Sequence, residues 1–392
     1  MSSKQISAIL AAVLLASWLG SIAASAQDCE VKIGAAGPFT GGGAGWGLAV
    51  KGGTDFEAAW TNLHGGLQMG DRKCKVTVVS FDSQSNAAGG AAAANYLASQ
   101  NVHVTNGPVV SPETTGFKPV GKRVGVIDFS VSFSSDVIGP AFPLAFHQNQ
   151  SPPTWGPVVI KAAKDRFKFN SVIVMGPNDQ SGTDSGRTLA DLYAATGANV
   201  RQEYYQRGTT NFSPIVVRIM SAAPETVELG PLPPGEAALL VRQLLEAGYT
   251  GAFGRLGAGA NTLIEGAGGA KNLKKFYWLA HVPMDDPGVK QLQADYKAVM
   301  KSDPPDDDLL YTSEAAAEQI LRAISIAGTD QDADKIAVAL RNEKIESRYL
   351  GKAGWRGKTQ YGINQELSFP VGMGVIEDGK QLPMVRLEIP TE

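Results

Sequence analysis

Residues 29–66 read CEVKIGAAGPFTGGGAGWGLAVKGGTDFEAAWTNLHGG, and this stretch decides the fold class. It starts with a short apolar run at residues 31–35, which predicts a buried strand. A glycine-rich turn follows, and apolar or small residues then recur at the three- and four-residue steps of a helix: Ala49, Gly53, Phe56, Trp60 and Leu63. Gly65 and Gly66 end the predicted helix, because a left-handed cap favours a residue without Cβ. The unit is therefore strand, turn, helix.

The same order of strand and helix repeats along the chain. Further strands are predicted at residues 76–81, 102–105 and 124–129, with a helix at 87–98. After a Pro-rich stretch at 151–153, a second series of strands and helices is predicted at residues 172–175, 184–196, 200–205, 227–229, 236–247 and 276–280. Alternating strands and helices imply parallel sheets covered by helices. We therefore expect an α/β fold with two doubly wound parallel-sheet lobes.

The N-terminal segment has the features of a secretory signal peptide. One positive charge, Lys4, precedes an uncharged run at residues 5–27 with a short apolar core. Small residues at Ala24 and Ala26 suit a signal peptidase, so we expect cleavage after Ala26, which removes residues 1–26 and leaves a periplasmic protein. An anchoring helix is the alternative, but the apolar run is short for a span of about 20 residues.

Charge and cysteine content bound the partners and the compartment. The chain has 35 basic and 38 acidic residues and a formal net charge of −3, without a basic cluster, so we expect no binding to nucleic acid.

Both cysteines, Cys29 and Cys74, open a predicted strand. If these strands are parallel neighbours, the sulfur atoms start in similar register, and an oxidising compartment favours a disulfide. Two free buried thiols are the alternative.

Three turns after predicted strands of the first lobe carry candidate ligand contacts, because ligands of open parallel sheets bind beyond the carboxyl ends of the strands. The glycine-rich turn contains Trp46, whose ring suits an apolar ligand. In the second turn, Ser111 and Pro112 predict a helix N-terminus with Ser111 as its cap, and such an end attracts a carboxylate. Ser130 and Ser132, in the third turn, add hydroxyl groups.

No motif for catalysis or for a cofactor emerges. The glycine-rich turn has neither a Lys followed by Ser or Thr nor a G-x-G-x-x-G spacing, which disfavours a nucleotide site. The histidines are isolated and form no metal-binding pattern: His64, His103, His147 and His281. Ser185 lacks the G-x-S-x-G context of a hydrolase, and Asp184 is better explained as a helix cap. We therefore expect a protein without enzymatic activity, metal or cofactor.

A series of short motifs runs through the mature chain in a specific order. It comprises Gly37-Pro-Phe-Thr-Gly41, Trp46-Gly47, Asn62-Leu-His-Gly-Gly66, Asp82, Gly107-Pro-Val-Val-Ser111, Gly186-Arg-Thr-Leu189, Asn211-Phe-Ser213 and a late helix at 311–328. In this order the motifs resemble the branched-chain amino-acid-type periplasmic binding proteins of ABC importers. The resemblance covers nearly all of the mature chain, although no single motif is decisive.

That resemblance implies the type I periplasmic binding protein fold, in which two lobes clasp the ligand and are joined by three crossovers. We expect the crossovers near residues 146–148, near 280–283 and within 351–368. The expected lobes are residues 27–146 plus 282–350 for the first, and 147–281 plus 351–392 for the second. The implied partners are the membrane permease and ATPase subunits of an ABC importer, and we expect a monomer.

The resemblance also implies a ligand carboxylate held by Ser111 and by groups at Ser130 and Ser132, with an aromatic residue at Trp46. Glu113, in the same helical turn as Ser111, must then point away from the ligand. In the second lobe the chain departs from the family pattern. Its side chains there are Leu256 where an acidic residue meets the ligand ammonium, Ser185 at a place often taken by tyrosine, the apolar Leu232, and Arg255 as a candidate donor to a keto or hydroxyl oxygen.

These departures predict the ligand class. An unpaired buried ammonium costs roughly several kcal/mol, so a pocket without an acidic partner should not accept one. We expect a small carboxylate with an apolar or aromatic tail, such as an aromatic acid or a 2-keto acid. A branched-chain or other hydrophobic amino acid is the alternative ligand. Presentation of the ligand to a chemoreceptor is the alternative role.

Overall fold

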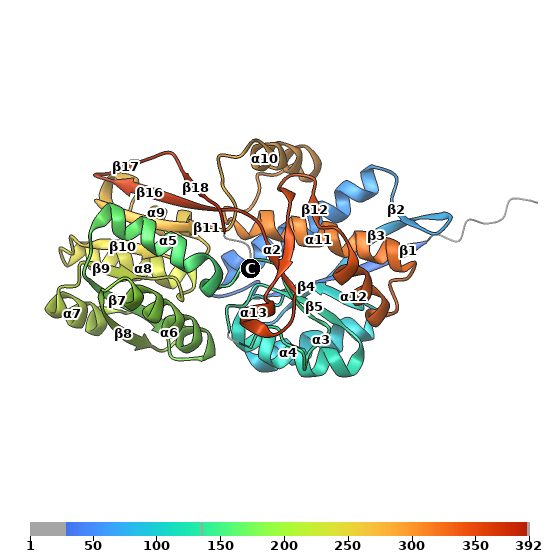
Figure 1. Ribbon diagram of the computed structural model, residues 1–392, viewed down its shortest axis with the longest axis horizontal. Helices are drawn as coiled ribbons and strands as arrows, with labels where there is room; N and C mark the ends of the chain where they lie inside the picture. Colours follow the sequence, from blue (N-terminus) through green and yellow to red (C-terminus); the bar gives the residue numbers. More distant parts are fainter. Residues whose placement is uncertain (1–28, 135, 390–392) are drawn as a thin grey trace, which may run out of the picture.

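The computed structural model describes residues 29–134 and 136–389, which form two lobes (Figure 1). Each lobe is built on one mainly parallel sheet with helices on both faces. The predicted α/β fold with doubly wound sheets is therefore confirmed. The predicted signal peptide, residues 1–26, lies outside the described residues.

The sheet of the first lobe has the strand order β14-β15-β6-β5-β4-β1-β3-β2. Its strands pair in parallel from β15 to β3, and the edge strands β2 and β14 pair antiparallel. The bounds are β1 (Glu30–Gly37), β2 (Leu67–Met69), β3 (Arg72–Asp82), β4 (Val104–Asn106), β5 (Ile127–Ser130), β6 (Ala145–His147), β14 (Gly354–Arg356) and β15 (Glu366–Ser368). Helices cover both faces of the inner strands, so a strand such as β5 is buried along its whole length.

Two groups of helices enclose this first sheet. The helices α3 (Ala87–Ser99) and α4 (Ser111–Val124) pack on one face. The other face is covered by α2 (Ala44–Leu63), α11 (Leu309–Ala327) and α12 (Ala333–Asn342). The helix α10 (Pro287–Met300) packs against the outside of α2, where Tyr296 stacks on Phe56. Short elements complete the lobe: β12 (Glu346–Ser347), β13 (Gly351–Lys352) and α13 (Lys358–Tyr361).

The sheet of the second lobe has the strand order β17-β16-β11-β10-β9-β7-β8, with β18 paired to β16. The bounds are β7 (Ser171–Pro177), β8 (Asn199–Tyr205), β9 (Thr226–Glu228), β10 (Ala252–Arg255), β11 (Lys275–Ala280), β16 (Val371–Glu377), β17 (Lys380–Gln381) and β18 (Val385–Leu387). One face carries α5 (Pro152–Phe167) and α6 (Gln180–Ala195). The other carries α7 (Ser213–Ala222), α8 (Pro234–Glu246) and α9 (Ala260–Gly266), with the short 3-10 helix η1 (Ala270–Asn272) nearby.

The chain passes between the sheets after β6, after β11 and after β15. The third passage corrects the expected lobe boundary at residue 351. Both β14 and β15 extend the first sheet, because Glu366 of β15 pairs with His147 of β6. Residues 354–368 therefore belong with the first sheet, and the second sheet takes up the chain only at β16.

Several predicted element boundaries are wrong by a few residues, among them two beside helices α4 and α6. The helix α4 continues to Val124 and ends at Gly125 in a left-handed conformation (φ 70°), so the strand predicted at 124–129 starts only at Ile127. The helix α6 starts at Gln180, because the side chain of Asp179 accepts the Gly182 backbone N–H at 3.1 Å. Asp179, and not Asp184, is therefore the cap of α6.

The predicted disulfide between Cys29 and Cys74 is confirmed. Cys29 directly precedes β1, and Cys74 lies in β3. These strands are parallel neighbours in which Glu30 lies opposite Lys75, so the two cysteines start in the same register.

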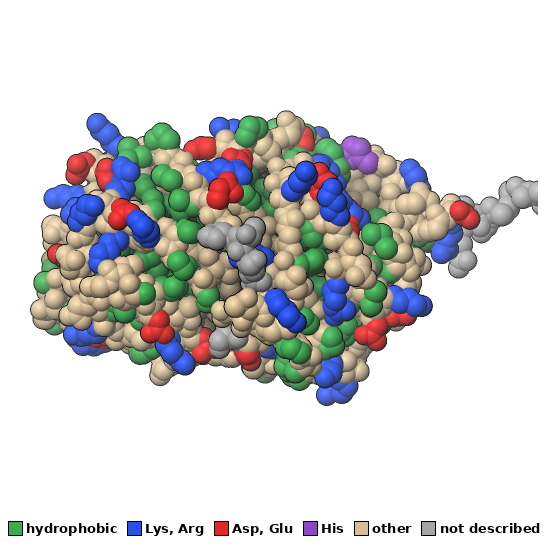
Figure 2. Space-filling view, viewed as in Figure 1, with side chains coloured by type: hydrophobic (Ala, Val, Ile, Leu, Met, Phe, Trp, Pro, Cys, Tyr) green, Lys and Arg blue, Asp and Glu red, His purple; other side chains and the backbone are tan. Residues whose placement is uncertain are grey.

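The surface shows no preference for one sign of charge on the face drawn in Figure 2, where basic and acidic side chains are interspersed. This agrees with the small net charge of the chain. Within residues 29–134 and 136–389, no helix combines the length and the apolar character that a membrane span requires.

Candidate ligand-binding site

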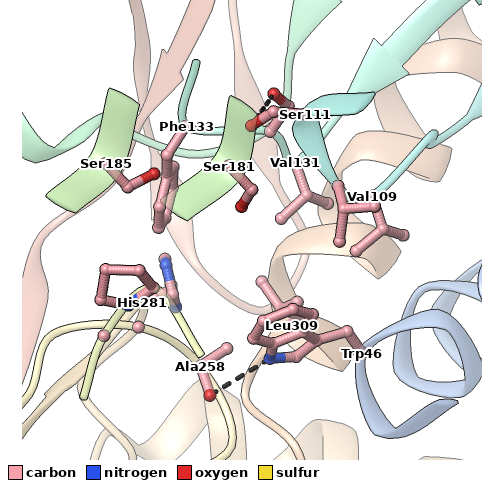
Figure 3. A pocket seen from close by; sticks show the side chains of 15 residues that line it. Trp46, Val109, Ser111, Val131, Phe133, Ser181, Ser185, Ala258, His281 and Leu309 are labelled. Carbon is pink, nitrogen blue, oxygen red and sulfur yellow. Dashed lines mark hydrogen bonds between the residues drawn. The ribbon is translucent and has the colours of Figure 1, made fainter. Parts of the chain in front are cut away.

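A cavity lies between the two lobes, beyond the carboxyl ends of several strands (Figure 3). Its walls include residues that follow β5, β9, β10 and β11 directly or closely, as expected for an open parallel sheet. Together with its opening to solvent, the cavity holds about 430 Å³ of space free of protein atoms. Residues of both lobes line the cavity.

The wall from the first lobe combines apolar side chains with a pair of hydroxyl groups. Its residues are Trp46, Val109, Val110, Ser111, Val131, Ser132, Phe133 and Leu309. Three residues predicted as ligand contacts, Trp46, Ser111 and Ser132, are therefore brought together. Ser130 is not among the cavity-lining residues, since it is buried in β5 and its hydroxyl donates to the carbonyl of Phe146 at 3.3 Å. Pro112 does not line the cavity either.

Trp46 lies in the first turn of α2 and not in a loop. Its side chain is 8% exposed, packs in a hydrophobic core cluster and also lines the cavity. Its Nε1–H donates to the carbonyl oxygen of Ala258 in the second lobe at 3.2 Å, drawn as a dashed line in Figure 3. The glycine in the next position has a packing reason, because a Cβ at Gly47 would lie 2.0 Å from the carbonyl oxygen of Pro38.

Ser111 and Ser132 form a hydroxyl pair at one end of the cavity. The Ser132 hydroxyl donates to Ser111 Oγ at 3.1 Å and accepts the backbone N–H of Ser134 at 3.3 Å. Ser111 is the first residue of α4, preceded by Val110 as its cap residue, which corrects the predicted capping role of Ser111. At this first helical position its backbone N–H has no acceptor within the helix, so N–H and hydroxyl are both suited to an anion.

Glu113 turns away from the cavity, as a carboxylate ligand requires. Its Oε1 accepts the Ser83 hydroxyl at 2.6 Å, and its Oε2 accepts the backbone N–H groups of Val109 and Val110, both at 3.1 Å. Burial raises the pKa of Glu113, while these hydrogen bonds oppose the rise. The first turn of α4 is thereby capped from behind, and the Ser111 side remains open to the cavity.

The wall from the second lobe is made of small residues. These are Ser181, Ser185, Gly230, Pro231, Gly257 and Ala258. The serines lie on α6, one turn apart, and the other residues follow β9 and β10. Ser185, a predicted contact, therefore lines the cavity. None of the described residues that line the cavity is acidic.

The other second-lobe predictions are wrong in their placement, because these side chains point into the protein. Leu232 and Leu256 are buried in two core clusters of the second lobe. Arg255 is fully buried, and its guanidinium donates to the carbonyls of Leu229 at 2.6 Å and Leu232 at 2.7 Å. It also donates to the carbonyl of Ala258, and burial lowers its pKa to about 10. Arg255 thus holds the turns that form the wall and leaves the ligand to other groups.

Three other carboxylates of the second lobe already have hydrogen-bond or ion-pair partners within the protein. Asp179 caps α6 and pairs with Arg207, while Asp184 accepts the Ser134 hydroxyl at 2.9 Å. Glu236 accepts the Tyr205 hydroxyl and the Gly208 backbone N–H. None of the three lines the cavity.

Sequence reasoning missed two ring-bearing residues of the cavity, Phe133 and His281. His281 follows β11 directly, at the crossover between the lobes, and its side chain is 1% exposed. Its ring stacks on Phe133 with ring centroids 5.8 Å apart. The position after a predicted strand was the available signal, since the other cavity residues also follow strands. Among the described residues, no group of three or more His, Cys, Asp or Glu side chains is arranged to hold a metal ion.

The sequence matches the profile of a family described as "Periplasmic binding protein" over residues 30–369. A relative named "Amino acid binding protein", from Pseudomonas aeruginosa, is 27% identical over 342 residues, which cover 84% of this chain and 87% of the relative.

Two solved structures share the fold. The branched-chain amino acid transporter substrate binding protein LivJ from Streptococcus pneumoniae, in complex with isoleucine, matches with a TM-score of 0.76 and 18% identity over 92% of this chain and 100% of LivJ. An ABC transporter solute binding protein from Rhodopseudomonas palustris, in complex with benzoate, matches with a TM-score of 0.73 and 16% identity over 92% of this chain and 98% of that protein.

Proposed function

Because the chain belongs to the periplasmic binding protein family, we propose that it is the substrate-binding component of an ABC importer and closes around a small carboxylate with an apolar or aromatic tail. Membership of the family makes the protein a solute-binding protein and not an enzyme, and it implies a periplasmic or extracellular location. The permease and ATPase subunits of the importer are the proposed partners.

One observation carries the ligand class: the cavity offers hydroxyl and amide donors on one wall, and none of the described residues on either wall is acidic. Ser111 and Ser132 are both buried, and because Ser111 Oγ accepts the Ser132 hydroxyl, the Ser111 hydroxyl proton remains to donate to a carboxylate oxygen. A hydrogen bond to a charged group contributes about 1.5–3 kcal/mol. An α-ammonium group in the same cavity would lose its water without gaining an anionic partner.

The apolar part of the first wall suits a hydrophobic tail. Trp46, Val109, Val131 and Leu309 line the cavity together and are all largely buried. Apolar area removed from water contributes about 25 cal/mol per Å², so an aromatic tail adds affinity without a further polar partner. We propose Trp46, Ser111, Ser132 and Ser185 as ligand contacts.

The relatives support two ligand classes. The Rhodopseudomonas palustris protein, which has the same fold, is in complex with benzoate, a carboxylate without an ammonium group. The isoleucine complex of LivJ and the name of the Pseudomonas aeruginosa relative favour an amino acid as the second candidate. The described residues that line the cavity of this chain include no acidic side chain, which favours a carboxylate without an ammonium group.

A thermal-shift screen of the mature protein tests the proposal. The compounds are benzoate, phenylpyruvate and other 2-keto acids, dicarboxylates and the twenty amino acids. A ligand at about 100 times its Kd stabilises the folded protein by about 2.7 kcal/mol, which is a clear shift in Tm. We expect shifts with the aromatic and 2-keto acids. A screen in which only amino acids shift the Tm would contradict the proposed ligand class.

A further inference from the structure

His281 is placed to meet a ligand, although its sequence context gives no sign of it. It lies directly after β11, at the passage from the second lobe to the first, and it lines the cavity. In the view of Figure 3, His281 and Ser185 lie on one side of the cavity and Trp46 and Val109 on the other. A ligand that reaches across the cavity from the Ser111 end therefore comes close to the imidazole.

One nitrogen of this imidazole is already committed. His281 Nδ1 lies 2.9 Å from Asp308 Oδ2, and the same oxygen accepts the His281 backbone N–H at 2.6 Å. Burial alone would raise the pKa of Asp308, but the charge and hydrogen bonds of His281 lower it below its ordinary value. Asp308 is therefore a charged carboxylate that accepts only, which places a proton on Nδ1.

The other nitrogen is free for a ligand. His281 Nε2 is buried and has no hydrogen-bond partner among the described residues. The stacking on Phe133 and the hydrogen bond from Nδ1 to Asp308 orient the ring, and the bond from the His281 backbone N–H holds Asp308 in place. Leaving a buried polar atom unpaired is costly, so a ligand oxygen that forms a hydrogen bond with Nε2 removes this cost.

We propose that His281, oriented by Asp308, binds an oxygen of the carboxylate ligand through Nε2 in the imidazolium form. The imidazolium form follows because the Nδ1 proton is held in the hydrogen bond to Asp308, so that donation from Nε2 to an acceptor oxygen needs a second proton on the ring. The positive ring attracts an anion and repels an α-ammonium group. This inference rests on the proposed function and gives it a selection mechanism inside the cavity.

A second histidine provides the matched control. His147 also lies at a crossover, its Nδ1 is 3.0 Å from Glu366 Oε2, and its buried Nε2 has no partner among the described residues. Its ring also contacts Phe133, edge-on, with ring centroids 6.3 Å apart. His147 does not line the cavity. The two dyads thus share their local chemistry and differ in access to a ligand.

The experiment compares His281→Gln and His147→Gln in the mature protein by calorimetry with phenylpyruvate and with benzoate. Glutamine keeps a similar size and a neutral donor but removes the positive charge. We expect His281→Gln to weaken binding at least about 10-fold, the factor that corresponds to about 1.4 kcal/mol. His147→Gln should stay within about 3-fold of the wild type, or about 0.65 kcal/mol. Equal binding by His281→Gln and the wild type would overturn the inference.

A spectroscopic measurement on the wild type covers the case in which the His281→Gln variant does not fold. The ¹⁵N chemical shifts of the imidazoles separate protonated from unprotonated ring nitrogens, and the chain has four histidines to assign. In the complex with the tighter of the two probes, we expect both nitrogens of His281 to be protonated. An unprotonated Nε2 in the complex would overturn the inference and leave the proposed function intact. If the wild type binds neither these probes nor any carboxylate of the thermal-shift screen, the proposed function fails, and this inference fails with it.

Discussion

The two lobes face the same cavity with different chemistry. The first lobe presents a hydroxyl pair, Ser111 and Ser132, beside a large apolar surface around Trp46. The second lobe presents small residues such as Gly230 and Ala258, held from behind by the buried Arg255. The first wall therefore carries the hydroxyl pair and most of the apolar surface, the second wall mainly sets the shape, and His281 lines the cavity at the crossover between them.

This difference teaches where specificity lies. A carboxylate needs donors, and the first lobe has them on a helix N-terminus and a strand end. An ammonium group needs an acid, and the described lining residues of the second lobe include none. Changes in the first wall should thus affect all carboxylate ligands, whereas the second wall decides which other groups are tolerated.

The largest expected effect is on stability and comes from the disulfide, which lies in the first lobe and has no counterpart in the second, because both cysteines of the chain lie in the first lobe. Cys29 and Cys74 are 45 residues apart, and closing a loop of this length removes entropy from the unfolded chain worth about 4 kcal/mol. Replacing both by serine should lower the free energy of unfolding by about that amount. Denaturant unfolding of the double variant and of the oxidised wild type measures it, and unchanged stability would contradict the expectation.

The next effect compares hydroxyl groups on the two walls. Ser111→Ala removes a donor to the carboxylate, so affinity for phenylpyruvate should fall by about 1.5–3 kcal/mol, or about 10- to 150-fold. Ser185→Ala changes the second wall by the same single atom and should cost less than about 1 kcal/mol. Calorimetry on both variants decides whether the walls differ. An equal loss in the two variants would mean that the carboxylate is shared between the lobes.

A smaller effect concerns the contact between the walls. Trp46→Phe keeps an aromatic ring but removes the Nε1–H that donates to the Ala258 carbonyl across the cavity. A hydrogen bond of this kind contributes about 0.5–1.5 kcal/mol, so affinity should fall by roughly 2- to 10-fold. Trp60→Phe, in the same helix but away from the cavity, is the matched control and should leave affinity unchanged. Equal affinities of the two variants would show that the hydrogen bond between Trp46 and Ala258 does not contribute to ligand binding.

The fold and the first wall could be predicted from the sequence, but most of the second wall could not. Strand–helix alternation and the order of the motifs are local signals, and Ser111 and Ser132 follow strands whose ends must meet at one edge. Arg255 was predicted as a contact because it stands at the end of a strand. Its side chain nevertheless points into the protein, where the carbonyls of Leu229 and Leu232 accept its hydrogen bonds. Sequence position alone does not reveal the direction of a side chain.

His281 is the opposite case, a cavity residue that its sequence context did not reveal. Its partner Asp308 is 27 residues further along the chain, and only the packing of the helix α11 against the crossover brings the two together. Leu232 and Leu256 were predicted as apolar ligand contacts, but the cores of the second lobe already bury them. Apolar residues near a site are ambiguous in a sequence, because core and cavity wall need the same side chains.

The cavity is proposed to accept a carboxylate and to reject the ammonium group of an amino acid. Calorimetry of the wild-type mature protein with phenylpyruvate and with phenylalanine tests it most directly, because the two ligands share the aromatic tail and the carboxylate. We predict that phenylpyruvate binds at least about 100-fold tighter, a difference of about 2.7 kcal/mol. Equal binding, or tighter binding of phenylalanine, would contradict the account and show that an acidic group reaches the ligand ammonium.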